Sequence, residues 1–168
     1  MRHKPSIAVY AAVVASCLAL AGAALAAAAP SRYVNARYGY AIDLPTGFGP
    51  VHEADNSDGG MSKAADGQSQ LSLWGENLLL DPLSADVQGR IDSATQEGWE
   101  ISYRKVTDRW ASWSGERDGR IFYARALLLC HDDQAGFFQL EYPSEKRDEF
   151  DPVVNGLVKS FARTDCDQ

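Results

Sequence analysis

One stretch of the sequence, residues 120–130, is apolar at nearly every position. Its even-numbered residues after Arg120 are all apolar: Phe122, Ala124, Ala126, Leu128 and Cys130. Its odd-numbered residues are mostly apolar as well, with Arg125 as the exception. Successive side chains of a strand point to opposite faces of a sheet, so this pattern indicates a central strand that is covered on both faces. The sequence therefore predicts an α+β domain, an α/β/α sandwich with helices on both faces of an antiparallel sheet.

Two segments have the apolar spacing of helices that could cover such a sheet. In the first, Asp81 can cap the helix, Pro82 suits the first helical position and Gly98 marks the end. Its apolar stripe consists of Leu83, Val87, Ile91 and Ala94. In the second, Asp151 and Pro152 repeat the start signal. The stripe of this second helix consists of Val154, Leu157, Val158 and Phe161.

The remaining segments predict strands that are joined by short turns. Extended-type sequence occurs at residues 32–35, 38–44, 61–65, 70–76, 99–106, 110–117, 120–130 and 137–142. The first two of these are expected to pair, and Asp66-Gly67 and Asp118-Gly119 are signals of two-residue hairpin turns. Residues 45–60 are rich in Pro, Gly, Asn, Asp and Ser and form the longest predicted irregular segment. The expected order is four strands, a helix, four strands and a helix.

The start of the chain has the layout of a secretory signal peptide. Arg2 and Lys4 precede a long apolar run, and Ala24 and Ala26 supply the small residues that signal peptidase requires. We therefore expect residues 1–26 to be cleaved. Cleavage removes two basic residues and changes the net charge from −7 to −9. This acidic balance argues against nucleic acid as a partner, because sequence-independent binding needs a dense Lys/Arg surface.

Two other fates of this leader remain open. Cys17 lies in a lipoprotein box, where it would be acylated, and residues 7–29 carry no charge and could remain as an uncleaved anchor. Membrane contact is expected only through the leader, either retained or lipidated at Cys17. Each alternative places the folded domain, expected at residues 31–168, in the periplasm or outside the cell, because the basic end stays inside.

Two cysteines remain once the leader is removed, Cys130 and Cys166. In an oxidising compartment an even pair of cysteines is typical of a disulfide. Such a bond would close a loop of 37 residues. In the chain-entropy model a loop of that length stabilises the fold by roughly 4 kcal/mol. A reactive thiol pair is disfavoured, because the C-x-x-C spacing is absent.

Most catalytic and metal-binding motifs are missing from the sequence. After the leader only His52 and His131 are available as imidazole ligands, with no Cys-rich or H-x-x-x-H spacing, so neither a metal site nor a cofactor is predicted. The string Trp113-Ser114-Gly115 lacks the first glycine of a serine-hydrolase elbow. Paired carboxylates of an envelope hydrolase leave no sequence signature, and this enzyme class remains an alternative.

The acidic segment 55–59 is a candidate binding loop. Asp55, Asn56 and Asp58 supply the oxygen atoms that hard cations prefer. An EF-hand is excluded, because alanines stand where its first acid and its bidentate glutamate belong. A calcium-stabilised structural domain with a different loop remains a second alternative. The competing interpretation is a turn held by side-chain hydrogen bonds in a long surface loop.

Exposed tryptophans can anchor a protein partner or stack on a sugar. Of the four tryptophans, all within residues 74–113, Trp113 is flanked by Ser112 and Ser114 and is expected to be partly exposed. Trp110 and Trp113 are separated by an odd number of residues, so a regular strand would place them on opposite faces. A sheet that is covered on both faces could bury both of them, so core packing is the competing interpretation. Trp113 is the fourth candidate binding residue.

Four strings of the sequence resemble a group of small exported bacterial proteins. They are R-Y-G-Y-A-I-D-L-P at 37–45, D-N-S-D-G at 55–59, D-G-Q-S-Q-L-S-L-W-G at 66–75 and L-V-K-S-F at 157–161. The domain of that group is similar to the PsbP/Mog-type α/β/α fold. The resemblance implies an accessory or interaction module, and it carries no ligand-binding residue over to this chain. Together with the missing catalytic motifs, it predicts a non-enzymatic exported domain that binds a protein partner or a small ligand.

Overall fold

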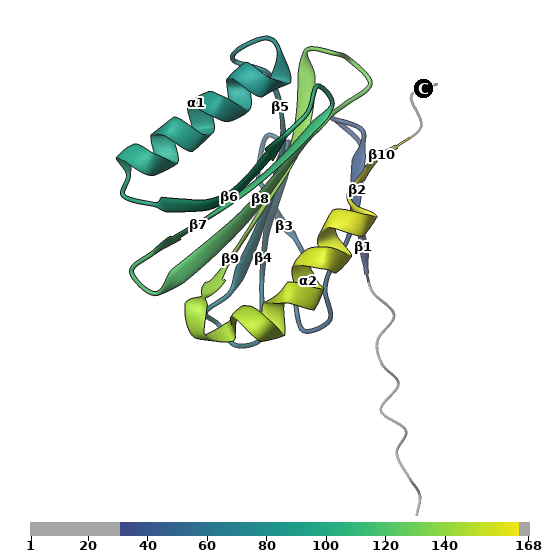
Figure 1. Cartoon of the computed structure of the whole chain (residues 1–168). Helices are drawn as coiled ribbons and strands as arrows, with labels where there is room; N and C mark the ends of the chain where they lie inside the picture. Colours follow the sequence, from purple (N-terminus) through teal and green to yellow (C-terminus); the bar gives the residue numbers. More distant parts are fainter. Residues whose placement is uncertain (1–30, 165–168) are drawn as a thin grey trace, which may run out of the picture.

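The computed structural model describes residues 31–164 (Figure 1). The predicted signal peptide, Cys17 and Cys166 lie outside these residues. The strands are β1 (Arg32–Asn35), β2 (Tyr40–Asp43), β3 (His52–Glu53), β4 (Gly59–Lys63), β5 (Gln70–Asn77), β6 (Glu100–Val106), β7 (Trp110–Arg117), β8 (Arg120–Leu128), β9 (Gln134–Pro143) and β10 (Ala162–Arg163). The helices are α1 (Leu83–Gln96) and α2 (Arg147–Ser160), and a short 3-10 turn, Ser144–Lys146, precedes α2. No helix within residues 31–164 has the length and apolar character needed to cross a membrane.

The strands form two antiparallel sheets. The large sheet has the order β3-β4-β5-β9-β8-β7-β6, and the small sheet has the order β1-β2-β10. The predicted pairing of the first two strands is confirmed, with Val34 opposite Ala41. The expectation of one sheet is wrong, because β10 pairs with the other side of β2, with Ala162 opposite Ala41. Both edges of β2 are then occupied, and β2 cannot join the large sheet.

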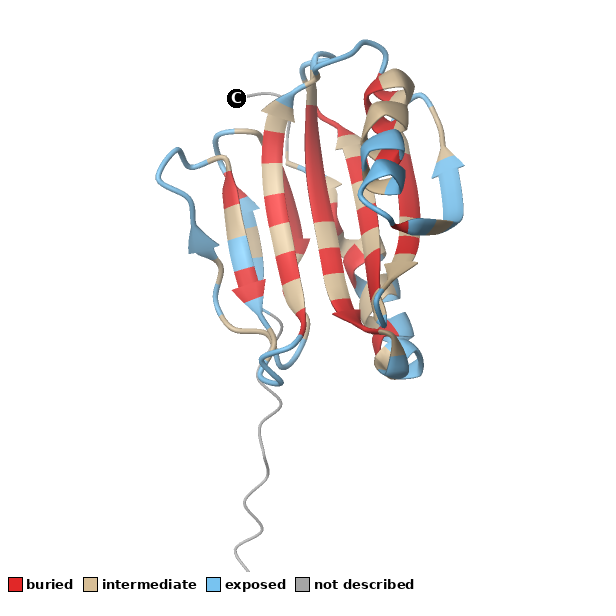
Figure 2. Ribbon diagram, turned by 90° about the vertical axis from the view of Figure 1, so that its left-hand side faces the viewer, coloured by how far each residue is buried: buried red, intermediate tan, exposed pale blue. Residues whose placement is uncertain are grey.

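The predicted covering of the large sheet on both faces is confirmed. The even-numbered residues of β8 from Phe122 onward belong to the core beneath α1, together with Leu83 and Val87 of that helix. Ile121, at an odd-numbered position of β8, belongs to a second core with Leu157 of α2 and residues of β2. Figure 1 shows α1 and α2 on opposite sides of the large sheet. Buried residues alternate with less buried ones along several of its strands (Figure 2).

Helix α1 begins and ends close to its predicted limits. Gly98 follows it with φ +92°, the left-handed backbone of a helix terminus. The predicted capping by Asp81 is wrong, since no side chain caps the first turn. The approach to the helix is held by Asp86 instead, whose Oδ1 accepts a hydrogen bond of 3.0 Å from the backbone N–H of Leu79.

Helix α2 begins at Arg147, so its predicted start at Asp151 is wrong, and Pro152 lies inside the helix. The buried ring of Phe150 explains the earlier start. It stacks on Tyr142 of β9 at a centroid distance of 4.6 Å. This contact fixes the first turn of the helix against the sheet.

The predicted two-residue turn at Asp118-Gly119 is confirmed, since Arg117 pairs with Arg120. The predicted two-residue turn at Asp66-Gly67 is wrong: β4 and β5 form a hairpin, but residues 64–69 connect them, since the last pair is Lys63 with Gln70. Gly67 has φ +67° between β4 and β5, and Asp118 and Gly119 both have positive φ between β7 and β8, the backbone of a type I′ turn. The predicted irregular segment 45–60 is wrong in part, because it contains β3. This strand has only two residues, both exposed, and therefore no apolar alternation by which the sequence could have shown it.

Candidate functional site

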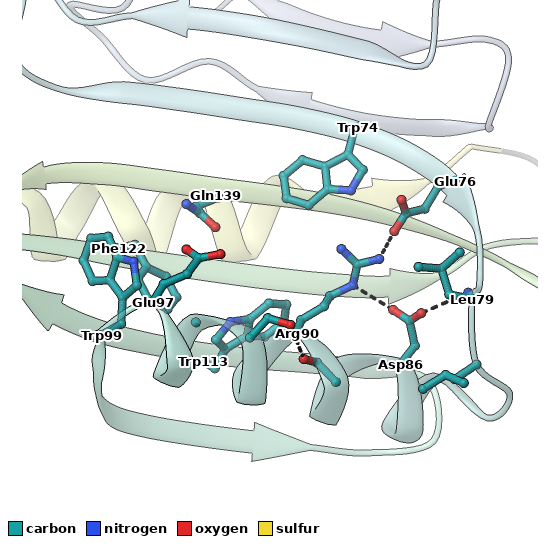
Figure 3. Close-up of a pocket in the computed structure, with 14 residues that line it drawn as sticks. Trp74, Glu76, Leu79, Asp86, Arg90, Glu97, Trp99, Trp113, Phe122 and Gln139 are labelled. Carbon is teal, nitrogen blue, oxygen red and sulfur yellow. Dashed lines mark hydrogen bonds and ion pairs between the residues drawn. The ribbon is translucent and has the colours of Figure 1, made fainter.

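A cleft of about 600 Å³ lies between α1 and the large sheet (Figure 3). Its walls come from α1, from the loop that precedes it, and from β5, β7, β8 and β9. The side chains that define its chemistry are Trp74, Glu76, Leu79, Leu80, Asp86, Arg90, Glu97, Trp99, Trp113, Phe122 and Gln139. We call this site the α1 cleft.

Aromatic rings form the inner surface of the α1 cleft. Trp99 packs edge-on against Phe122 at a centroid distance of 4.9 Å. Trp74 stacks on the buried ring of Phe137 at 5.2 Å, with an interplanar angle of 7°. The strand alternation places these rings on the α1 face among small residues, the fully buried Ala111, Ala124 and Ala126. Large rings beside methyl groups leave an uneven apolar surface beneath the helix.

Arg90 occupies one end of the α1 cleft and is held by two carboxylates. Its Nε donates a hydrogen bond of 2.7 Å to Asp86 Oδ2, and its Nη2 donates to Glu76 Oε1. The guanidinium carbon lies 4.3 Å from the centroid of the Phe137 ring. Burial lowers the pKa of the Arg90 guanidinium. These contacts fix a polar wall against the aromatic surface.

The two carboxylates do not form the pair that glycoside hydrolysis requires. That reaction needs one carboxyl group to protonate the leaving group and a second, free carboxylate to act as base or nucleophile. Both oxygens of Asp86 are occupied, one by Leu79 N and the other by Arg90. Oε1 of Glu76 is bonded to the same guanidinium. Asp86 and Glu76 are therefore both engaged by Arg90.

The rim of the α1 cleft carries two exposed apolar side chains. Leu79 is 82% exposed and Leu80 is 52% exposed, both in the loop between β5 and α1. They are among the most exposed large apolar residues of the described chain. At the other end, Arg117 lies over the ring of Trp99 at 4.5 Å and donates a hydrogen bond to the carbonyl oxygen of Glu97. The rim is thus apolar at one end and charged at the other.

Three of the four predicted site residues lie away from the α1 cleft. Asp55, Asn56 and Asp58 are in the turn between β3 and β4. The Asn56 side chain donates to Asp58 Oδ2 at 2.5 Å and accepts from the Asp58 N–H at 3.3 Å. Asn35 binds the carbonyl oxygen of Ser57 at 3.0 Å. These contacts fit the alternative of a turn held by side-chain hydrogen bonds. Within residues 31–164, no group of three or more His, Cys, Asp or Glu side chains is arranged to hold a metal ion.

The expectation that Trp113 is partly exposed is wrong. Its side chain is buried beneath α1, with 4% of its surface exposed. The flanking Ser112 and Ser114 point to the other face of β7, so their polarity says nothing about the surroundings of Trp113. Trp113 nevertheless lines the α1 cleft, together with Trp74 and Arg90. Sequence reasoning missed Arg90, although its spacing of four residues from Asp86 is a signal of an ion pair on a helix.

A second cleft, of about 770 Å³, lies between β2 and α2. Leu44, Pro45, Val153 and Leu157 supply its apolar lining. Arg32 and Asp43 stand in its wall and pair at 2.6 Å. The charges of Arg32 and Asp43 are therefore satisfied by one another.

No family model matches the sequence, and no curated protein matches it. Solved structures do match. The solution structure of the cyanobacterial PsbP, CyanoP, from Synechocystis sp. PCC 6803 is 15% identical, with a TM-score of 0.58, over 89% of this chain and 98% of that one. The chain has the PsbP/Mog1-like fold.

Mog1 structures match over a similar length. The Ran-binding protein Mog1p of Saccharomyces cerevisiae is 10% identical with a TM-score of 0.58, over 82% of this chain and 96% of its own. A mutant of the protein Mog1 is 9% identical with a TM-score of 0.59, over 82% of this chain and 97% of its own. At these identities the similarity concerns the fold alone, and it confirms the fold expected from the sequence strings.

Proposed function

We propose that this chain is an exported, non-enzymatic binding protein, and that the α1 cleft receives an apolar side chain or short apolar segment of a protein partner. The observation that carries the proposal is the exposure of Leu79 and Leu80 beside the aromatic surface of the cleft. Large apolar side chains in contact with water next to a concave aromatic surface are typical of interaction sites. The basic and apolar leader supports export to the periplasm or the cell exterior.

The fixed polar wall of the α1 cleft supports a recognition role. Arg90 already has two carboxylate partners, so it does not need a charged ligand to satisfy it. An apolar group can fill the space beside Trp74 without removing any of these ion pairs. The fold relative Mog1p is a Ran-binding protein, which gives weak additional support for a protein partner.

Site-specific photo-crosslinking tests this proposal. A photoreactive phenylalanine analogue replaces Ser93, a polar residue of α1 that lines the cleft. Crosslinked products from the envelope fraction of the source cell are then identified by mass spectrometry. We expect one recurrent product that is lost when Leu79 and Leu80 are both changed to Ser. Because both side chains are mostly exposed, the double variant should fold normally.

The matched control is V34S, since Val34 is 51% exposed on β1 and does not line the cleft. This variant should retain the crosslink. Persistence of the product in the Leu79/Leu80 double variant would contradict the proposed site, as would equal loss in V34S. The candidate residues of the β3–β4 turn are tested in parallel with D55A and D58A, which should also retain the crosslink because their turn lies outside the cleft.

A further inference from the structure

Arg125, the one charged residue of β8 after its first residue, Arg120, lies on the sheet face opposite α1. Its neighbours in the strand, Ala124 and Ala126, belong to the core beneath α1, so Arg125 points the other way. Across the sheet it is level with Ser112 of β7 and Lys105 of β6. Helix α2 covers the same face, but its main contacts are with β2, β9 and β8. On the neighbouring strand β6, Tyr103 and Lys105 are exposed on this face.

Aromatic rings and a second cation surround the Arg125 guanidinium. Its carbon Cζ lies 4.5 Å from the centroid of the Trp110 ring, and Lys105 Nζ lies 5.2 Å from the same centroid. Nη1 of Arg125 donates a hydrogen bond of 3.0 Å to Ser112 Oγ. Tyr123, the neighbour of Arg125 two residues earlier, stacks with Tyr103 at 6.4 Å. We call the six residues Tyr103, Lys105, Trp110, Ser112, Tyr123 and Arg125 the Arg125 patch.

The Arg125 patch has no negative charge to balance its two cations. Among residues 31–164, neither Arg125 nor Lys105 forms an ion pair. Glu116, on the same face of β7, is paired with Arg147. Arg90, which is also partly buried, has two carboxylate partners. A buried cation without a counter-ion is costly, and proteins normally pair such groups.

The hydrogen bonds of Arg125 are incomplete as well. Its Nε is buried and has no hydrogen-bond partner among the described residues. Because Nη1 is bonded to Ser112, the edge formed by Nε and Nη2 is the part of the guanidinium that remains for an acceptor. This edge has the fork geometry that accepts two oxygens of a carboxylate or a phosphate. Burial lowers the pKa of this guanidinium, in agreement with the missing counter-ion.

We propose that the Arg125 patch is a second ligand site, which binds a phosphate or carboxylate group attached to an aromatic body. The anionic group supplies the counter-ion for Arg125 and Lys105. The aromatic body stacks on Tyr103, whose ring is 44% exposed. Trp110 lies over the face of the guanidinium and leaves its edge to the anion, and the side chains that enclose Nε shift when the anion reaches the Nε–Nη2 edge. This site is separate from the α1 cleft, which lies on the other face.

Nuclear magnetic resonance titration of the chain tests this site directly. The probes are phenyl phosphate, benzoate, inorganic phosphate and the neutral benzamide. The two reporters are the Arg125 Nε–H and the Trp110 indole N–H resonances. We expect phenyl phosphate and benzoate to shift both, inorganic phosphate to bind more weakly, and benzamide to leave both unchanged. Because hydrogen bonds to charged groups are strong, R125M should weaken binding by about 10-fold to 100-fold.

The variant R104Q is the matched control, because Arg104 is an exposed cation of the same strand as Lys105 but lies level with Trp113 on the α1 face. It should bind the anions as the unchanged chain does. If R125M does not fold, K105Q takes its place, since Lys105 is exposed, and a clear loss of affinity is again expected. Three results would overturn the proposal: no shift with any anion, equal binding of benzoate and benzamide, or undiminished binding by the folded variants. Equal binding of inorganic phosphate and phenyl phosphate would contradict the role of the rings.

Discussion

Arg90 Nε and Asp86 Oδ2 lie 2.7 Å apart, one helical turn from each other on α1. The Asp86 side chain is almost completely buried, with 2% of its surface exposed, whereas that of Arg90 is 24% exposed. The buried charge of Asp86 therefore needs Arg90 as its counter-ion, whereas the guanidinium of Arg90 is also hydrated by solvent and needs Asp86 less. This asymmetry gives the first prediction.

Replacing Arg90 with Met should destabilise the protein, because it leaves the charge of Asp86 buried without a partner. We expect a loss of about 2–4 kcal/mol in the free energy of unfolding, the lower part of the range for a broken buried pair, since Arg90 is partly screened by solvent. Urea denaturation measures this loss. Adding D86N should restore part of it, because an amide oxygen can still accept from Leu79 N. If the changes in the free energy of unfolding caused by R90M and D86N simply add, the predicted coupling between Arg90 and Asp86 is contradicted.

Acid should weaken the fold through Asp66. This carboxylate accepts hydrogen bonds from Lys146 and from the N–H groups of Gln68 and Ser69, and these contacts hold its pKa well below its usual value of 3.8. A depressed pKa means that the stabilisation is present above the unfolded value and is lost as the pH falls below it. Urea unfolding between pH 7 and about pH 2 should show this decline.

The variant D66N should flatten that decline in stability, since the titrating group is gone. D108N is the matched control, because Asp108 is exposed and forms no ion pair among the described residues. It should leave the pH dependence unchanged. A D66N protein with the full acid sensitivity would show that other carboxylates are responsible.

A methyl group at Gly59 should disrupt the pairing of β4 with β5. A Cβ at this position would lie 1.9 Å from the carbonyl oxygen of Leu73, which belongs to the backbone of the neighbouring strand. We expect G59A to lower the stability by about 1–3 kcal/mol or more, as other overpacked sites do. Thermal unfolding measures the effect.

The control for G59A is G156A, on the exposed side of α2, where a Cβ would meet nothing within 4 Å. Because alanine is the better helix former, this change should raise the stability by about 1 kcal/mol. A lower stability of G59A together with a higher stability of G156A would separate the effect of steric overlap from that of helix propensity. A G59A protein as stable as the original would mean that β4 can shift away from β5.

The disulfide between Cys130 and Cys166 stays a prediction. Cys130 Sγ lies 3.9 Å from the carbonyl oxygen of Thr164, two residues before Cys166, which supports the pairing. Two residues span at most about 7 Å of chain. We expect the oxidised protein to lose two thiol hydrogens in intact-mass spectrometry. We also expect C166S, which should match the reduced protein, to melt at a lower temperature. An unchanged mass on reduction would rule the bond out.

Much of the fold could be predicted from local sequence. The two-faced apolar pattern of β8 predicts a covered sheet, and the Asp118-Gly119 turn predicts its hairpin, because these signals depend on neighbouring residues alone. The partition into two sheets could not be predicted. The partition depends on the pairing of β10 with β2, and β10 has only two residues and follows α2 in the chain. No periodicity can be read from two residues.

The candidate site was harder to predict than the fold. Arg90 and Glu76 are 14 residues apart, in a helix and a strand, and their contact depends on how α1 crosses the sheet. The inner surface of the cleft combines residues of four strands. The polarity of Ser112 and Ser114 predicts exposure of Trp113, whereas the alternation of β7 places Trp113 on the opposite face from these two serines. Burial in this case follows the face of the strand and not the adjacent residues.

The small sheet joins the beginning and the end of the described chain. β1 and β10 flank β2 on its two sides, so the first and last strands are held within one three-stranded unit. Figure 1 shows this unit on the α2 side of the large sheet, away from α1. A carrier, a surface or a lipid attached next to β1 or β10 would therefore lie on the α2 side of the domain. The α1 cleft would then face away from the attachment.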